Sequence, residues 1–94
     1  MTYKLEFDPR ALKEWKKLGD PIRQQLKKKL AEILEHPHIE ANKLRDLPDC
    51  YKIKLLTSGY RLVYQVQDER ITVFVVAVGK RERLAVYSAA EKRL

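Results

Sequence analysis

The sequence predicts an α+β domain in which a four-stranded antiparallel sheet carries an N-terminal αα hairpin on one face, with a short helix at the C-terminus. Three observations support this fold class. An alternating segment opens the chain, two helical stripes with a short connection follow it, and three strand-like segments joined by hairpin-sized turns come last. The 94 residues suffice for one hydrophobic core, so residues 1–94 are predicted to form a single domain.

The first strand and the two helices each have a local signal. Residues 2–7 alternate apolar and polar side chains, as in a half-buried strand. Asp8-Pro9 and Asp20-Pro21 each place a capping residue before a proline, which is typical of a helix start. Gly19 should end the first helix and Pro37 the second. The expected apolar stripes are Leu12, Trp15 and Leu18 in the first helix, and Ile22, Leu26, Leu30, Ile33 and Leu34 in the second.

Three further strands are expected, roughly at residues 51–56, 60–67 and 71–78. The turns at Ser58-Gly59 and at residues 68–70 are short enough for hairpins, so these strands should be antiparallel neighbours. The strand at residues 71–78 is apolar on nearly both faces, which indicates a central strand. Its second neighbour is then expected to be the strand at residues 2–7. One face of the sheet should stay partly open, because the helical hairpin covers only the other face.

The charge of the chain narrows the class of partner. Lysine and arginine number 20 against 13 acidic residues, which gives a formal net charge of +7. Such an excess favours polyanions, with nucleic acid ahead of an anionic membrane. The chain shows no apolar leader and no apolar run long enough to cross a bilayer. One cysteine and two histidines make a poor zinc set, so we expect a cytoplasmic protein without metal, cofactor or membrane.

The most informative residues are cations from separate segments that the predicted sheet brings to one face. Lys52 and Lys54 alternate along a strand, with Cβ atoms roughly 6–7 Å apart. Arg61 follows the next turn and can lie across from them, and Arg81 and Tyr87 follow the last strand. Like charges this close are unfavourable unless an anion lies between them, and they favour loss of a proton from lysine but not from arginine. The set suits a bound phosphodiester.

A cluster of this kind is chemically sufficient for RNA cleavage. RNA supplies its own nucleophile, because the 2′-hydroxyl lies beside the scissile phosphate. The protein must then remove that proton, stabilise the pentavalent phosphorane and protonate the departing 5′-oxygen. A site built from cations alone can do this where positioning and charge stabilisation supply most of the reduction in the barrier.

Each of these residues also has a structural interpretation. Lysines on a sheet edge often only prevent edge-to-edge pairing, and alone Lys52 and Lys54 are more typical of a solvated face. Tyr87 can stack on a base or pack the terminal helix onto the sheet, with packing slightly favoured. His36 and His38 flank a proline without an evident partner and are expected to be ordinary loop residues.

The chain resembles the RelE family, the toxins of bacterial type II toxin–antitoxin modules. The resemblance rests on three segments, Cys50–Tyr64 with its Lys-Ile-Lys and Ser-Gly-Tyr-Arg motifs, Val78–Arg83 (Val-Gly-Lys-Arg-Glu-Arg) and Val86–Ser88 (Val-Tyr-Ser). It extends over almost the whole chain, including Leu12–Trp15 and Glu40–Arg45. It implies an endoribonuclease that enters the ribosomal A site and cuts the mRNA codon there by metal-free attack of the 2′-hydroxyl.

The resemblance also implies which residues act. The catalytic set falls on Lys52, Lys54, Arg61, Arg81 and Tyr87, with Lys54 as the general base and Arg81 assisting the leaving oxygen. Leu56 stands where the best-known members carry arginine, on the strand face of the two lysines, which puts one RNA contact in doubt. Further cations expected to contact RNA are Arg45, Lys80, Arg83, Arg23, Lys27 and Lys28, the last three on a helix face that is more often simply solvated.

The implied partners are a RelB-like antitoxin, the 70S ribosome with its 16S rRNA at the A site, and mRNA. In the family, the antitoxin wraps the toxin and displaces the terminal helix from the site, and a basic surface with a loosely apolar C-terminal helix suits an acidic, partly disordered partner. Two alternatives remain open. One is an RNA-binding or ribosome-binding inhibitor that cleaves nothing, and the other is a ParE-like toxin of DNA gyrase. The lysine–arginine–tyrosine set argues against the second.

Overall fold

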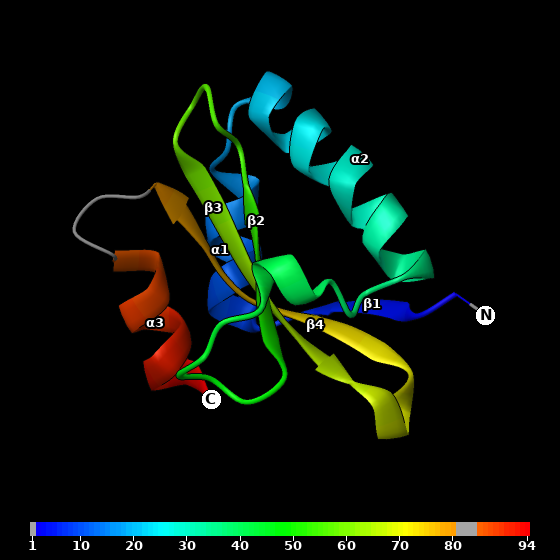
Figure 1. The fold of residues 1–94 in the computed structure, drawn as a ribbon. Helices are drawn as coiled ribbons and strands as arrows, with labels where there is room; N and C mark the ends of the chain where they lie inside the picture. The colour runs from blue at the N-terminus through cyan, green and yellow to red at the C-terminus, as the bar shows by residue number, and fades with distance from the viewer. Residues whose placement is uncertain (1, 81–84) are drawn as a thin grey trace.

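The computed structural model describes residues 2–80 and 85–94, which form four strands and three α-helices (Figure 1). A three-layer arrangement results, because α2 and α3 lie on opposite sides of the sheet (Figure 1). Single 3-10 turns occupy Glu40–Asn42 and Asp68–Arg70. The elements in chain order are β1 (Lys4–Phe7), α1 (Pro9–Lys16), α2 (Asp20–Glu35), β2 (Cys50–Lys54), β3 (Tyr60–Gln67), β4 (Thr72–Lys80) and α3 (Ala85–Arg93).

The fold class is confirmed, but the sheet is mixed and not wholly antiparallel. The strand order is β1-β4-β3-β2. Both hairpins are antiparallel as expected, whereas β1 runs parallel to β4, with Lys4 opposite Thr72. The reason lies in the helices: the end of α2 returns to the start of β1, where the Tyr3 N–H donates to the Leu34 carbonyl at 2.8 Å. The chain therefore enters β2 running the same way as β1. Each of the two hairpins reverses the direction once, so β4 again runs the same way as β1.

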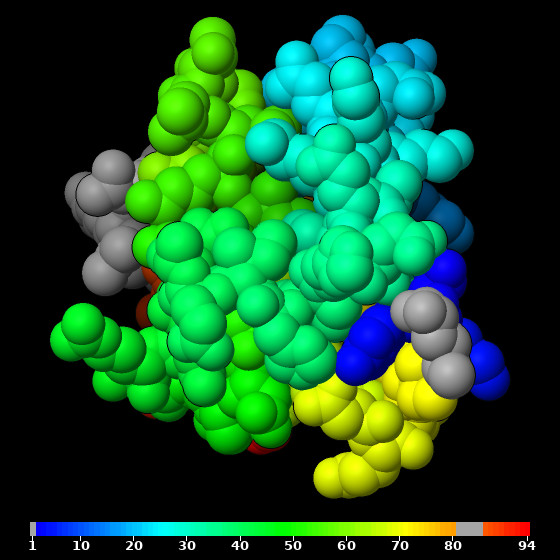
Figure 2. Space-filling model, turned by 45° about the vertical axis from the view of Figure 1, so that its right-hand side comes forward, coloured from blue at the N-terminus to red at the C-terminus, as the bar shows by residue number. Residues whose placement is uncertain are grey.

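Helix α2 and the strands form the larger core cluster. Leu26, Leu30 and Ile33 of α2 are buried against the sheet, as their spacing predicted. In α1 the predicted stripe was wrong in part, because Ala11 is fully buried while Leu12 is exposed. Helix α1 packs mainly against β4, so its small residue faces the strand. Figure 2 shows α2 beside the connection from residue 36 to 49 on this side of the molecule.

The helix boundaries follow their capping signals with one correction. The Asp8 carboxylate accepts a hydrogen bond from the Arg10 backbone N–H at 2.9 Å, which confirms the predicted cap of α1. Helix α1 ends at Lys16, and the correction falls at the α1–α2 junction: Gly19 does not end α1 but is the N-cap residue of α2, so Asp20 is the first residue of α2 and not its predicted cap. Helix α2 ends at Glu35, just before the predicted stop at Pro37.

The second face of the sheet is covered by α3. Val63, Val76 and Ala77 form a smaller cluster there with Val86 and Ala90 of α3. The β3–β4 register shifts between Val63, which pairs with Ala77, and Tyr64, which pairs with Val75. Because of this bulge, Val76 and Ala77 both face α3 although they are adjacent in sequence. Within residues 2–80 and 85–94, none of the helices has the length and apolarity to cross a membrane.

Candidate nucleic-acid interface

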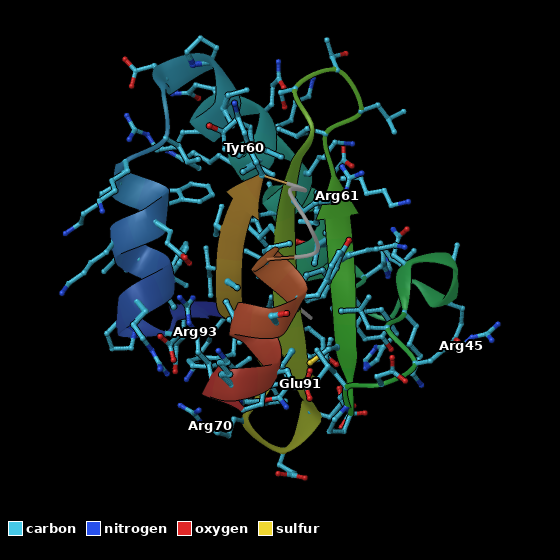
Figure 3. All side chains as sticks on the ribbon, turned by 90° about the vertical axis from the view of Figure 1, so that its left-hand side faces the viewer. Arg45, Tyr60, Arg61, Arg70, Glu91 and Arg93 are labelled. Carbon is cyan, nitrogen blue, oxygen red and sulfur yellow. The ribbon has the colours of Figure 1, made fainter. Side chains whose placement is uncertain are left out.

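A cleft of about 390 Å³ opens between α3, the outer part of the sheet and the connection that precedes β2. Figure 3 looks onto this side of the molecule and labels Arg45 on the connection, Arg61 on β3 and Glu91 on α3, which are among the residues that line the cleft. The lining combines cationic, acidic and apolar side chains, namely Leu44, Arg45, Asp46, Leu47, Lys52, Lys54, Arg61, Tyr87 and Glu91.

Strand pairing brings three of the predicted cations together. Lys54 lies directly opposite Arg61 in the β2–β3 register, and Lys52 lies opposite Val63, whose side chain packs under α3. Residues two apart on a strand share a face, so Lys52, Lys54 and Arg61 all project toward α3. The sequence predicted this convergence because the hairpin turn fixes the register.

Arg61 differs from the two lysines in being buried. Only 6% of its surface is exposed. Its Nη1 donates to the Tyr60 carbonyl at 3.4 Å, and its buried Nε has no hydrogen-bond partner among the residues that the structure describes. A buried donor without an acceptor is costly. The guanidinium is therefore fixed at the wall of the cleft with donor capacity that an anionic oxygen would satisfy.

Tyr87 fits both interpretations that its position in the sequence allowed. It is half-buried and, like Leu44, Leu47 and Phe74, packs against the buried cluster between the sheet and α3. It also lines the cleft. An aromatic ring held beside leucine side chains at the edge of a cationic cleft suits a stacked nucleobase.

Two carboxylates in the cleft escaped the sequence analysis. Asp46 lies on the connection and Glu91 on α3, and both line the cleft with the cations. Glu91 is four residues after Tyr87, so helical spacing places it on the same face. That spacing was the available signal. Asp46 had none, because the path of the connection depends on tertiary packing.

Of the remaining predicted RNA contacts that the structure describes, all but Arg45 lie away from the cleft lining. Arg45 lines the cleft. Lys80 stands opposite Tyr60 with its Nζ 5.5 Å from the ring centroid, and Tyr60 packs against the core cluster on the α2 side. Arg23 donates to the Leu18 carbonyl at 3.3 Å and so supports the α1–α2 junction. Lys27 and Lys28 belong to α2, across the sheet from α3, while Arg81 and Arg83 lie outside the described residues.

Leu56 requires a correction. The predicted strand at residues 51–56 ends at Lys54, so Leu56 lies in the turn and not on the strand face of the lysines. It is 87% exposed and borders a separate hollow beside Ile33 of α2. An exposed position in a turn tolerates many side chains, so Leu56 does not interrupt the cleft.

His38 is also more connected than expected. Its Nε2 lies 3.0 Å from a carboxylate oxygen of Asp68, which also accepts a hydrogen bond from the Tyr3 hydroxyl at 2.7 Å. The Tyr3 and His38 rings meet edge to face. These residues are far apart in sequence, so no local pattern could indicate the contact. Cys50 is fully buried, and its burial raises the pKa of the thiol to about 11.

No three His, Cys, Asp or Glu side chains gather closely enough to hold a metal ion within the ranges 2–80 and 85–94. The polar groups that line the cleft are instead mainly cations, which neither bind metal ions nor need them to hold a phosphate.

Comparison with known proteins identifies the family of the chain. The family described as "ParE toxin of type II toxin-antitoxin system, parDE" matches residues 5–85. Two curated relatives, the mRNA interferase toxin RelE of Escherichia coli K12 and the mRNA interferase RelE of Shigella flexneri, are each 70% identical over 100% of this chain and 99% of their own length. The chain belongs to the RelE/ParE family of toxins. The predicted family membership is thus confirmed, on the RelE side.

Solved structures of RelE show the same fold. The free R81A/R83A mutant of E. coli toxin RelE aligns with a TM-score of 0.93 at 68% identity, over 100% of this chain and 99% of that one. The toxin in the intact E. coli RelBE toxin–antitoxin complex aligns at 0.84 and 72% identity, over 86% of this chain and 99% of that one. The same mutant toxin in complex with an antitoxin RelBc peptide aligns at 0.84 and 68% identity, over 100% and 99%.

Proposed function

We propose that this chain is a ribosome-dependent mRNA interferase, an endoribonuclease that cuts the codon in the ribosomal A site and so inhibits translation. The observation that carries the proposal is the convergence of Lys52, Lys54, Arg61 and Tyr87 on one cleft. Full-length relatives that are 70% identical and bear the name mRNA interferase support it. The cleft offers cations for a phosphodiester and an aromatic ring for a base.

The proposed reaction uses the 2′-hydroxyl of the RNA as the nucleophile. The 2′-hydroxyl attacks the adjacent phosphorus, the bond to the 5′-oxygen breaks, and a 2′,3′-cyclic phosphate and a free 5′-hydroxyl result. Lys54 is assigned to accept the 2′-hydroxyl proton, because a lysine next to a permanently charged arginine gives up its proton more readily. Arg61 and Lys52 stabilise the charge that develops on the phosphorane.

Tyr87 and Arg81 complete the proposed assignment. Tyr87 stacks on a base and so holds the nucleotide in line for attack. Arg81 assists the leaving 5′-oxygen, a role that rests on the family resemblance because residue 81 lies outside the described ranges. We further propose that Arg45, at the rim of the cleft, contacts the RNA backbone, and that the cations of α2 meet ribosomal RNA.

The proposed regulator is a RelB-like antitoxin. The toxin of E. coli is found in complex with its antitoxin in the structures compared above. A formal charge of +7 on this chain favours an acidic partner, and electrostatic attraction would speed the association. The proposed site of action, on ribosomes, places the protein in the cytoplasm.

Primer extension on mRNA from translating ribosomes tests the activity. Wild type should give cuts within the A-site codon, whereas Lys54→Ala and Arg81→Ala should each reduce cleavage by about 100-fold or more. Lys4→Ala, on the edge strand opposite β2, removes one exposed lysine far from the cleft and should retain cleavage. Full cleavage by the Lys54→Ala/Arg81→Ala double variant would contradict the assignment. Translation arrest with intact mRNA would indicate an inhibitor that binds RNA without cutting it.

A gyrase toxin is the second candidate, because the matching family is described by ParE. It predicts gyrase-linked DNA breaks after expression, with mRNA left uncut. Gel analysis of plasmid DNA from the same cultures as the primer extension distinguishes the two activities directly.

A further inference from the structure

Arg93, at the end of α3, joins three parts of the fold. Its Nη1 donates to a Glu14 carboxylate oxygen of α1 at 2.8 Å and to the Val76 carbonyl of β4 at 2.9 Å. Its Nη2 donates to the other Glu14 oxygen at 3.2 Å. Glu14 in turn accepts a hydrogen bond from the Val78 backbone N–H at 3.1 Å. In Figure 3 Arg93 lies between the lower end of α3 and α1.

These contacts replace strand pairing along the outer edge of β4. Strand β1 pairs with β4 only from Thr72 to Val75, and the last bond on this side runs from the Asp8 N–H to the Val75 carbonyl. Beyond that point the Val76 carbonyl and the Val78 N–H need other partners, because buried backbone groups must be hydrogen-bonded. The Glu14 carboxylate accepts the hydrogen bond from the Val78 N–H, and the Arg93 guanidinium donates to the Val76 carbonyl. The Arg93 side chain is largely buried in this position, with 12% of it exposed.

Helix α3 otherwise lies against β4 and β3, mainly through small side chains among its described residues. It has nine residues, too few to be stable in isolation, so its position depends on packing. Among residues 86–93, the buried apolar side chains are Val86 and Ala90, which are both small. Val86, Ala90 and Arg93 share one helical stripe, because they follow the spacing i, i+4 and i+7. The bidentate ion pair therefore extends the sheet-facing side of the helix.

We propose that the Glu14–Arg93 pair positions α3 at the cleft, so that Glu14 and Arg93 are positioning residues for the proposed reaction. Tyr87 and Glu91 lie on another stripe of the helix, turned about 120–160° from Arg93, and form the α3 wall of the cleft. A rotation or shift of α3 would move the Tyr87 ring away from Lys52 and Arg61. The positioning of α3 does not depend on what the cleft binds, whereas its effect on catalysis rests on the proposed function.

Hydrogen exchange of the free protein tests the positioning directly. Arg93→Ala should raise amide exchange in α3 by about tenfold or more, while β3 amides keep their protection. Glu14→Gln keeps the shape of α1 and should have the same effect, which provides a second variant if Arg93→Ala folds poorly. Lys92→Ala removes an exposed cation from the same helix and should leave exchange within about twofold. Unchanged α3 exchange in Arg93→Ala and Glu14→Gln would overturn the proposal.

Single-turnover cleavage of ribosome-bound mRNA then tests the consequence. Arg93→Ala should cleave about tenfold or more slowly at saturating enzyme, since a misplaced wall lowers the rate of the chemical step. Arg93→Lys should recover only part of the rate, because lysine lacks the fork that holds both Glu14 oxygens. Faster cleavage by Arg93→Ala would overturn the proposal, because it would show that α3 shields the cleft from RNA. A wild type that cuts no mRNA would contradict the proposed function alone, and α3 exchange would still decide the positioning.

Discussion

Arg61 is the residue that distinguishes the cleft from an ordinary solvated lysine face. Two lysines on a strand are compatible with a surface that only resists aggregation. A buried guanidinium opposite one of these lysines is not typical of such a surface. Burying the guanidinium costs desolvation energy, and its charge repels the lysine across the strand pair. Such a residue is expected where function, and not stability, selects it.

Replacing Arg61 with methionine should therefore separate stability from activity. Methionine keeps the length of the side chain but removes the buried Nε and the charge opposite Lys54. We expect the free energy of unfolding, measured in urea, to rise by about 1 kcal/mol. Codon cleavage should fall by about 100-fold. The matched control is Arg70→Met, at an exposed arginine paired with Glu6. A clear loss of stability in Arg61→Met would show that Arg61 has stabilising contacts in solution.

Glu91 should weaken RNA binding, since its carboxylate lines a cleft meant for phosphate. Glu91→Gln removes the charge at constant size, so we expect RNA to bind a few-fold more tightly, measured by fluorescence anisotropy at low salt. Glu32→Gln, on the exposed side of α2, is the control for net charge. Weaker binding in Glu91→Gln would mean that the carboxylate accepts a hydrogen bond from the RNA instead of repelling it.

At the scale of elements, a polar cluster joins three segments at the end of the sheet remote from the cleft. Tyr3 precedes β1, His38 follows α2, and Asp68 begins the turn between β3 and β4. The hydrogen bond from Tyr3, followed by that from His38, lowers the pKa of the Asp68 carboxyl below its usual 3.8. The ionised carboxylate is thus the form that ties the segments together.

This pKa shift predicts the direction of a pH effect on stability. A carboxyl whose pKa is lower in the folded state stabilises the fold above its unfolded pKa, and loses that contribution as the pH falls through the folded value. The thermal midpoint of wild type should therefore fall more steeply below about pH 4 than that of Asp68→Asn. Glu69→Gln, at the next position of the same turn, should keep the wild-type slope. Equal slopes for wild type and Asp68→Asn would contradict a folded-state role for this carboxylate.

Local signals explain which elements the sequence could predict. The sequence predicted the bounds of every strand and of both N-terminal helices to within a few residues. The signals were the prolines at helix starts, the alternation of apolar and polar residues in strands, and the hairpin turns. The parallel pairing of β1 was not predictable in this way, because it depends on where α2 ends in space. The same holds for Glu14 and Arg93, and for His38 and Asp68, whose contacts span many residues and carry no local pattern.

At the scale of the whole molecule, the positive charge is divided between two sides. Lys52, Lys54 and Arg61 line the cleft beneath α3, while α2 carries Lys27 and Lys28 across the sheet. The sequence predicted this separation, because the helical hairpin was expected on one face of the sheet and the strand cations on the other. The fold separates them, so a short RNA can meet only one side at a time, whereas a ribosome is large enough to meet both.

The salt dependence of binding tests this division. Each phosphate contact on single-stranded RNA contributes about −0.7 to the slope of log K against log salt, so the four cations that line the cleft predict a slope of about −3 for a short oligonucleotide. Lys52→Ala should reduce that slope by about 0.7, since one contact is lost, and Lys28→Ala should leave it unchanged. On ribosomes Lys28→Ala should weaken binding as well, because rRNA can reach α2. A smaller slope for the oligonucleotide with Lys28→Ala would place RNA on both faces and would contradict a single cleft.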